Sequence, residues 1–113
     1  MDKIDELKKT LRELKNNKKI IAVILFGSFV TGKMKPLSDI DIAVISKNQN
    51  RKIETEINAY SSKKIDIVNF HRLPLYIQFE VLKEGKPIFI RNKKYFKELK
   101  LSVLKQYLEM TYI

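Results

Sequence analysis

Residues 20–45 read IIAVILFGSFVTGKMKPLSDIDIAVI, in which two strand-like runs flank a loop-like segment. The stretch begins with a continuous apolar run over Ile20–Phe26 that is rich in β-branched residues, which predicts a strand buried on both faces. Gly27 ends that run, and the Gly, Pro and Ser residues that follow are typical of a loop. A second strand is predicted over Ile40–Ile45, at the end of the stretch.

The flanking sequence alternates helical and strand-like patterns. Apolar residues recur at helical spacing over residues 2–15, 51–60, 74–84 and 93–111, and short strand-like runs occupy residues 64–70 and 88–90. Strands that alternate with helices predict the α/β class, here in its mixed α+β form. We therefore expect residues 1–113 to form a single domain in which helices flank a small mixed sheet of three to four strands.

Length and composition narrow the class of protein. A chain of 113 residues suits one compact domain and is too short for a separate substrate domain. The absence of cysteine excludes a disulfide framework and a cysteine-based zinc site. The start, MDKIDELKK, lacks the apolar segment of a secretory signal, and no apolar run approaches the roughly 20 residues that span a bilayer. We therefore expect a cytoplasmic protein without a membrane segment.

The formal net charge of +10 predicts attraction to polyanions such as nucleotides or an acidic protein partner. The excess comes mostly from lysines spread along the whole sequence, which is typical of solvated surfaces. Arginine is scarce and no aromatic stacking motif is present, although both are common in modules that read RNA or DNA. We therefore do not expect nucleic acid to be the direct substrate.

Three of the five aspartates lie within predicted strands, where aspartate is disfavoured. Side chains alternate across a strand, so Asp39 and Asp41 share the face opposite to the isoleucines between and after them. Asp66 lies in the same way between two isoleucines of the next strand. If the two strands are neighbours, the three carboxylates form one cluster, and without a cation at least one of them should have a raised pKa.

Hard oxygen ligands without a nearby His or Cys select Mg²⁺ or Mn²⁺ over zinc. We therefore predict that Asp39, Asp41 and Asp66 hold metal, with room for the two ions of a two-metal site. The alternative is that Asp39 is a turn residue and that the other two carboxylates point into solvent from a sheet covered on one face only.

The loop after the first strand is a candidate phosphate site. Gly27 permits a positive φ and close backbone approach, and the hydroxyl of Ser28 could donate to a phosphate. Lys33 follows within reach of an anion. On its own, a Gly-Ser pair is equally consistent with an ordinary strand exit and a serine helix cap.

Gly27-Ser28, ten further residues and then Asp39-Ile40-Asp41 form the pattern G-S-x10-D-x-D. This pattern resembles that of the DNA polymerase beta-like nucleotidyltransferase superfamily. The stretch FGSFVTGKMKPLSDIDIAV is similar to its minimal nucleotidyltransferase (MNT) branch, and so are Asp66 and the later segment LPLYIQFEVLKEGKPIF. The resemblance covers most of the chain and is weakest in the first fifteen and last twenty residues.

The resemblance implies catalytic roles for the carboxylates and a nucleotide role for the loop. It implies that Ser28 contacts the β- or γ-phosphate of ATP, that Asp39 and Asp41 bridge two Mg²⁺ ions, and that Asp66 binds the ion that activates the attacking hydroxyl. Many relatives carry Arg immediately before the second glycine of this loop, where this chain has Thr31. Lys33 is the candidate replacement for that charge.

The resemblance also implies a partner. MNT proteins of this size are commonly antitoxins of HEPN-type ribonuclease toxins, and they transfer AMP to a tyrosine of the toxin. Two alternatives stay open: a nucleotidyltransferase that modifies a small molecule with the help of a partner subunit, and an antitoxin that acts by binding alone. A homo-oligomer is a further option, because the predicted last helix is apolar on more than one face.

The single histidine, His71, follows the third predicted strand, near the predicted edge of the carboxylate cluster. A histidine in this position could act as a base. A loop histidine at the start of a helix is more often structural, and we favour that interpretation.

Overall fold

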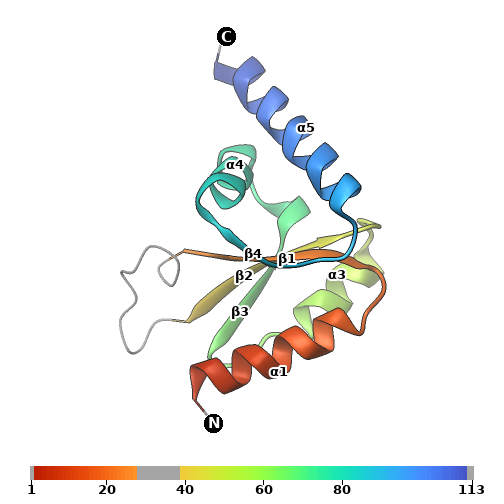
Figure 1. The fold of residues 1–113 in the computed structure, drawn as a ribbon, viewed down its shortest axis with the longest axis vertical. Helices are drawn as coiled ribbons and strands as arrows, with labels where there is room; N and C mark the ends of the chain where they lie inside the picture. Colours follow the sequence, from red (N-terminus) through yellow and green to blue (C-terminus); the bar gives the residue numbers. More distant parts are fainter. Residues whose placement is uncertain (1, 28–38, 112–113) are drawn as a thin grey trace.

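The structure is a computed structural model, and it describes residues 2–27 and 39–111 of the chain. The described part contains four α-helices and four β-strands, drawn in Figure 1. In chain order these are α1 (Lys3–Lys15), β1 (Ile20–Phe26), β2 (Ile40–Ser46), α3 (Arg51–Asn58), β3 (Ile65–Asn69), the 3-10 turn η1 (Phe70–Arg72), α4 (Leu75–Glu84), β4 (Lys86–Ile90) and α5 (Lys93–Thr111).

The strands form one mixed sheet in the order β3-β2-β1-β4. β1 pairs antiparallel with both β2 and β4, whereas β2 and β3 run parallel. The α/β class and the small mixed sheet predicted from the sequence are therefore confirmed. β4 lies at the edge of the sheet, which suits its Pro87 because proline cannot donate a ladder hydrogen bond.

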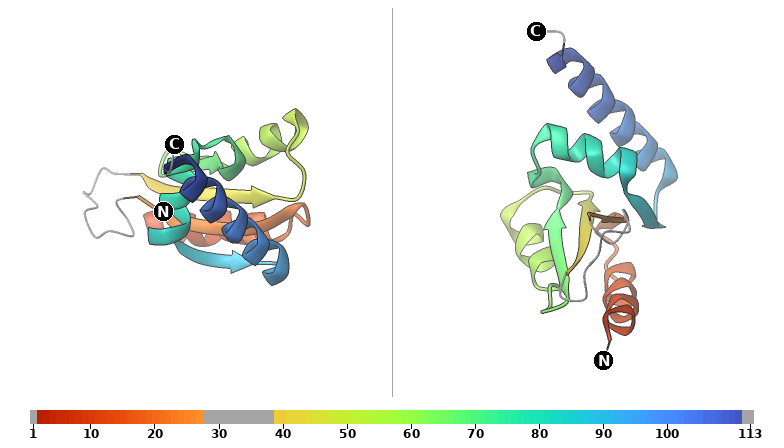
Figure 2. Two further views of the ribbon diagram at one scale, coloured as in Figure 1. Left: turned by 90° about the horizontal axis from the view of Figure 1, so that it is seen from above. Right: turned by 90° about the vertical axis from the view of Figure 1, so that its left-hand side faces the viewer.

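Helices cover both faces of the sheet, as Figures 1 and 2 show. On one face, Leu14 of α1 and Ile53 and Ile57 of α3 pack against the alternate residues of the strands. On the other face, Val81 of α4 and Phe96 of α5 pack against the remaining ones. Both central strands are therefore apolar at almost every position, and this explains the unbroken run IIAVILF of β1.

Two predicted elements end earlier in the structure than the sequence pattern indicates, and β4 begins at Lys86 rather than at residue 88. α3 ends at Asn58 rather than at residue 60, and β3 ends at Asn69 rather than at residue 70. The side chain of Asn69 accepts a hydrogen bond from the backbone N–H of His71 at 3.0 Å, which starts a 3-10 turn where the strand was predicted to continue.

Gly85 ends α4 as predicted, for a steric reason. Its φ is −73°, so no positive dihedral requires glycine there. A Cβ atom at this position would instead lie 2.3 Å from the carbonyl oxygen of Val81 and 2.7 Å from Cγ2 of Ile24. The chain must pass this close to β1 in order to enter β4, and only glycine allows it.

α5 begins and ends where the sequence pattern predicts. It packs on the sheet through the buried Phe96 and Val103. Farther along, the ring of Tyr107 stacks on that of Phe79 of α4, with ring centroids 4.0 Å apart. The helix then continues beyond the body of the molecule, as Figure 1 shows. No helix in residues 2–27 and 39–111 is both long and apolar enough to cross a membrane.

Candidate active site

The parallel pairing of β2 and β3 places two of the predicted site residues side by side. Asp41 is the register partner of Asp66, and the flanking isoleucines pair in the same ladder. The isoleucines point to the face covered by α1 and α3, so the two carboxylates share the opposite face. Asp39 precedes β2 by one residue and is exposed. The prediction that these two strands are neighbours is therefore confirmed.

Gly27 lies against the same carboxylate. It follows β1 directly, and Phe26, the last residue of that strand, is the register partner of Asp41. Gly27 has a φ of +76°, the left-handed conformation that favours glycine. A Cβ atom here would lie 2.5 Å from Oδ2 of Asp41. Glycine is thus required twice, by the turn and by the carboxylate beside it.

Burial raises the pKa of Asp41, and the negative charges of Asp66 and Asp39 raise it further. The sequence predicted a raised pKa from like-charge repulsion, and that direction is confirmed. Burial, however, raises the pKa of Asp41 more than either neighbouring carboxylate alone does. Asp41 is therefore a carboxylate held in a state that a cation would stabilise.

The donor set fits a hard divalent cation. The carboxylates of Asp41 and Asp66 supply only oxygen, their mutual repulsion favours a positive charge between them, and Asp39 offers a further oxygen ligand from outside the strand. Among residues 2–27 and 39–111, no three His, Cys, Asp or Glu side chains are drawn together as a closed ligand set. The assignment of Asp39, Asp41 and Asp66 as metal ligands therefore remains a prediction.

A cavity of ≈ 230 Å³ opens beside Gly27, between the end of β1 and α4. Phe26, Ile77 and Val81 give it an apolar floor, and Glu80 and Glu84 supply carboxylates. Sequence reasoning did not single out these two glutamates. They are separated by one helical turn on α4, and nothing in the sequence shows that α4 crosses the end of β1.

The remaining predicted nucleotide-binding residues lie outside the described part of the chain. Ser28, Lys33 and Thr31 all fall in residues 28–38. Their predicted contacts with phosphate are therefore neither supported nor contradicted by the structure.

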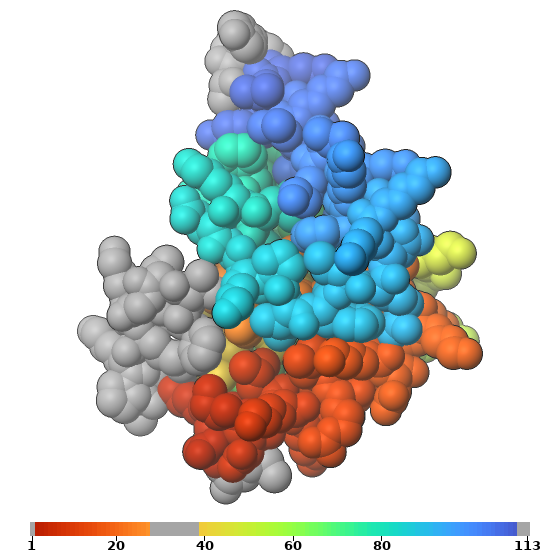
Figure 3. All heavy atoms as spheres, in the orientation of Figure 1, coloured from red at the N-terminus to blue at the C-terminus, as the bar shows by residue number. Residues whose placement is uncertain are grey.

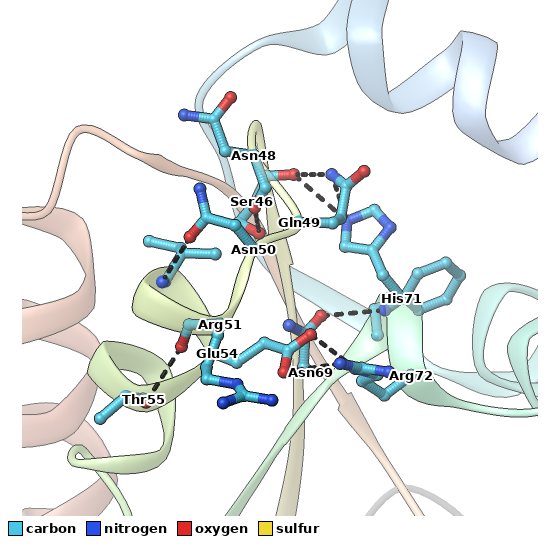
Figure 4. A network of polar contacts seen from close by, with 12 residues as sticks. Ser46, Asn48, Gln49, Asn50, Arg51, Glu54, Thr55, Asn69, His71 and Arg72 are labelled. Atoms are coloured by element: carbon cyan, nitrogen blue, oxygen red, sulfur yellow. Dashed lines mark hydrogen bonds and ion pairs between the residues drawn. The ribbon is translucent and has the colours of Figure 1, made fainter.

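His71 does not lie where the sequence suggested. Asp41 and Asp66 are near the N-terminal ends of β2 and β3, whereas His71 follows the C-terminal end of β3. Its Nε2 lies 3.2 Å from the carbonyl oxygen of Ser46, the last residue of β2, and donates to it. The expectation that His71 lies near the carboxylate cluster is wrong, and its contacts favour the structural role (Figure 4).

The surroundings of His71 form a closed polar network (Figure 4). The buried hydroxyl of Ser46 donates to the carbonyl oxygen of Asn48 at 2.7 Å. Nearby, Nε and Nη2 of Arg72 donate to the two carboxylate oxygens of Glu54, and this pairing lowers the pKa of that glutamate. Burial lowers the pKa of His71, so the ring is neutral near pH 7.

The profile of a known family, polymerase beta nucleotidyltransferases, matches residues 8–94. The matched residues include Gly27, Asp39, Asp41 and Asp66, whose arrangement is described above. This chain belongs to the polymerase beta nucleotidyltransferase family. The prediction of that family from the G-S-x10-D-x-D pattern is therefore confirmed.

Among curated members of the family, the chain is similar to "Putative protein adenylyltransferase MJ1547" of Methanocaldococcus jannaschii. The two are 37% identical over 71 residues, which make up 63% of this chain and 57% of the relative. The chain thus spans little more than half the length of this curated relative.

Solved structures share the fold of this nucleotidyltransferase domain. A toxin–antitoxin crystal structure with AMP-PNP contains a chain that superposes with a TM-score of 0.70 at 20% identity, covering 96% of this chain and 89% of that one. A tri-AMPylated Shewanella oneidensis HEPN toxin in complex with an MNT antitoxin gives a TM-score of 0.67 at 21% identity, covering 99% and 91%. At these identities the likeness establishes the fold.

Proposed function

We propose that this chain is an Mg²⁺-dependent nucleotidyltransferase that transfers AMP from ATP to a tyrosine of a HEPN-type toxin and so acts as its antitoxin. The observation that carries the proposal is the pairing of Asp41 with Asp66 beside the positive-φ Gly27. Family membership supports the reaction type. The solved complex of an AMPylated HEPN toxin with an MNT antitoxin supports the choice of acceptor.

In the proposed reaction, the oxygen of the tyrosine hydroxyl attacks the α-phosphorus of ATP and a new phosphorus–oxygen bond forms. The bond from the α-phosphorus to the oxygen that bridges it to the β-phosphate breaks, and pyrophosphate leaves with the electron pair. The proton of the hydroxyl passes to the carboxylate of Asp66. The product is an AMP–tyrosine phosphodiester.

The residues divide this work. Gly27, Ser28 and Lys33 are proposed to hold the triphosphate, and Asp39, Asp41 and Asp66 are proposed to hold two Mg²⁺ ions. When bound, the metal would neutralise phosphate charge and lower the pKa of the attacking hydroxyl. Asp66 is exposed, so the hydroxyl of a docked protein can reach it, whereas its partner Asp41 is half-buried.

The test is incubation of the protein with ATP, Mg²⁺ and the HEPN-type acceptor, followed by mass spectrometry of both proteins. We expect one or more AMP additions on a tyrosine of the acceptor. Asp66→Asn should abolish them and leave ATP binding largely intact. Asp5→Asn is the matched control, because it makes the same chemical change on the exposed side of α1.

Each contrary outcome identifies an alternative. A tight complex that neutralises the toxin without any AMP addition would mean that the antitoxin acts by binding alone. AMP addition to a small molecule, with none on the acceptor protein, would favour the nucleotidyltransferase that modifies small molecules.

A further inference from the structure

α5 exposes a stripe of large apolar side chains that the nucleotidyltransferase site does not use. Leu101, Leu104 and Leu108 are 57%, 40% and 48% exposed, and Met110 near the end of the helix is 46% exposed. The intervals of three and four residues place the leucines along one line of the helix. α5 lies on the outside of the molecule, beyond α4, in the space-filling view (Figure 3).

Shallow hollows lie along this stripe. One of ≈ 350 Å³ is lined by Leu101, Leu104 and Leu108 together with Lys105 and Glu109. A second, of ≈ 210 Å³, lies where α5 meets α4, and Leu101 and Leu104 contribute to it as well. An apolar line with this spacing and hollows on its flanks is the kind of surface that accepts one further helix.

The charges beside the stripe limit what that helix can be. If Leu101 and Leu104 are the a and d positions of a heptad, Lys100 is a g position and Lys105 is the following e position. Two copies that paired in parallel along this line would bring Lys100 of each close to Lys105 of the other, and an opposite charge would come only one heptad earlier, from Glu98 beside Lys93 of the second copy. The positions that would extend the line toward the start of α5 are Lys97 and Lys94, which would add further like charges.

An antiparallel pair of copies meets the same difficulty. A two-fold axis near the centre of the stripe sets the central residues against themselves. Lys105 is at that centre, so the two copies would face each other with the same positive charge. In both orientations the lysines beside the leucines would face lysines of the second copy, whereas acidic residues on a different helix would complement them.

We propose that this face of α5 binds an amphipathic helix of the acceptor protein, one with an apolar line flanked by Asp and Glu. The choice of the acceptor as owner of the helix rests on the proposed function, because transfer to a protein requires a docked protein. The helix-binding property itself rests only on the apolar line of α5 and its flanking lysines.

The first test uses two synthetic helical peptides that carry leucine at the a and d positions. One carries glutamate at its e and g positions and the other carries lysine there. Calorimetric titration of the whole protein should give at least about tenfold tighter binding of the glutamate peptide, equal to about 1.4 kcal/mol. Equal affinities, or no binding of either peptide, would overturn the proposal.

Substitutions locate the binding. Leu104→Ser should weaken binding of the glutamate peptide about tenfold or more, and Lys100→Glu with Lys105→Glu should reverse the preference between the peptides. Ile4→Ser is the matched control, because Ile4 is a 45% exposed aliphatic residue on the opposite face of the molecule. If the control weakens binding as much as Leu104→Ser does, α5 is not the site.

Sedimentation velocity tests self-pairing. The unchanged protein should not dimerise through α5, whereas Lys105→Glu alone should promote dimers, because it converts the Lys100–Lys105 contact of a parallel pair into an attraction. A dimer of the unchanged protein that Leu104→Ser dissociates would overturn the proposal in favour of a second copy.

The last test separates this inference from the proposed function. With the HEPN-type acceptor, Leu104→Ser should weaken complex formation about tenfold or more and leave ATP binding unchanged. Complex formation that depends on Leu104, without AMP transfer, would support the docking face and refute the proposed function. AMP transfer that Leu104→Ser leaves unchanged would support the proposed function and refute the docking face.

Discussion

The two ends of the parallel pair β2–β3 differ in the surroundings of their polar side chains. At the C-terminal end, Ser46, Asn69 and His71 are joined by hydrogen bonds to neighbouring side chains and backbone groups. At the N-terminal end, Asp41 and Asp66 are register partners with like charges, and the pKa of Asp41 is raised. The same two strands thus hold polar groups joined by hydrogen bonds at one end and like-charged carboxylates side by side at the other.

The difference indicates which end is built for a ligand. A closed network stabilises the fold and leaves little for a ligand to gain. A carboxylate that is half-buried beside another one destabilises the folded state, and a bound cation would recover that cost. The closed end has one exception, since the buried Nδ2 atom of Asn69 has no hydrogen-bond partner among the described residues.

The largest expected effect comes from Asp41→Asn, which should act on activity and stability in opposite directions. AMP transfer should fall by about 10²–10³ or more, as for loss of one group that stabilises transition-state charge. Without metal, the melting temperature should rise, because the neutral amide removes the repulsion with Asp66 and Asp39. Mg²⁺ should raise the melting temperature of the unchanged protein more than that of the variant.

Calorimetry and an AMP-transfer assay on one preparation measure both predicted changes, the higher melting temperature and the lower activity. The contrast between the two ends fails if Asp41→Asn lowers stability without metal, or if Mg²⁺ stabilises both proteins equally.

The two structurally constrained glycines give the next effect in size. Gly27→Ala should cost about 1–2 kcal/mol, because its φ is positive, and it should displace the carboxylate of Asp41. We expect ATP binding to weaken about tenfold or more. Gly85→Ala should cost about 1–3 kcal/mol by overpacking against Val81 and Ile24, with ATP binding unchanged in the folded protein.

Urea unfolding measures the loss of stability in each variant. Titration with ATP shows which of the two variants also loses nucleotide binding. If Gly27→Ala binds ATP as tightly as Gly85→Ala does, Gly27 has no role in nucleotide binding beyond that of Gly85.

The sequence predicted elements best where one pattern has one meaning. The run over Ile20–Phe26 and the helical spacing over Lys93–Thr111 were predicted with the bounds that the structure shows. The neighbouring positions of Asp41 and Asp66 could also be predicted, because aspartates among isoleucines in two strands have few alternatives to a shared site.

The sequence did not reveal distances along a strand. His71 follows Asp66 by only five residues, which suggested proximity. From Asp66 to Asn69, where β3 ends, the extended chain already spans roughly 10 Å, so His71 in the turn beyond lies at the opposite end of the strand from Asp66. Likewise, the cavity between Gly27 and Glu80 depends on how α4 crosses β1, and that crossing is set by packing of the whole second core.

A smaller effect is expected from Asn69→Ala at the closed end. The side chain of Asn69 caps the 3-10 turn through His71, and loss of such a cap costs about 0.5–2 kcal/mol. Removal of its buried, unbonded Nδ2 atom should bring the cost toward the lower limit. AMP transfer should stay within about twofold of normal, because Asn69 lies at the end of β3 away from Asp66. A twofold change in rate corresponds to about 0.4 kcal/mol in activation free energy. Chemical denaturation and the transfer assay check this, and a large loss of transfer in a folded variant would mean that the two ends are coupled.

The smallest effect is the pH dependence that His71 contributes. Burial lowers the pKa of His71 from its ordinary value of 6.5, so the unfolded chain binds a proton more readily than the folded protein does. Stability should therefore be fully present above about pH 6.5 and should decline as the pH falls through the lower, folded pKa. Asp41 acts in the opposite sense, because its raised pKa means that stability is lost as the pH rises from 3.8 through the folded value.

Melting temperatures between pH 4 and 8 without metal, measured for the unchanged protein, His71→Gln and Asp41→Asn, separate the two contributions. We expect His71→Gln to reduce the fall in melting temperature below pH 6.5 by no more than about 4–8 °C, which is the shift that about 1 kcal/mol produces in a small domain. If His71→Gln instead leaves the decline unchanged, the ring is not held neutral by the closed end, and the contrast between the two ends of the sheet rests on the carboxylates alone.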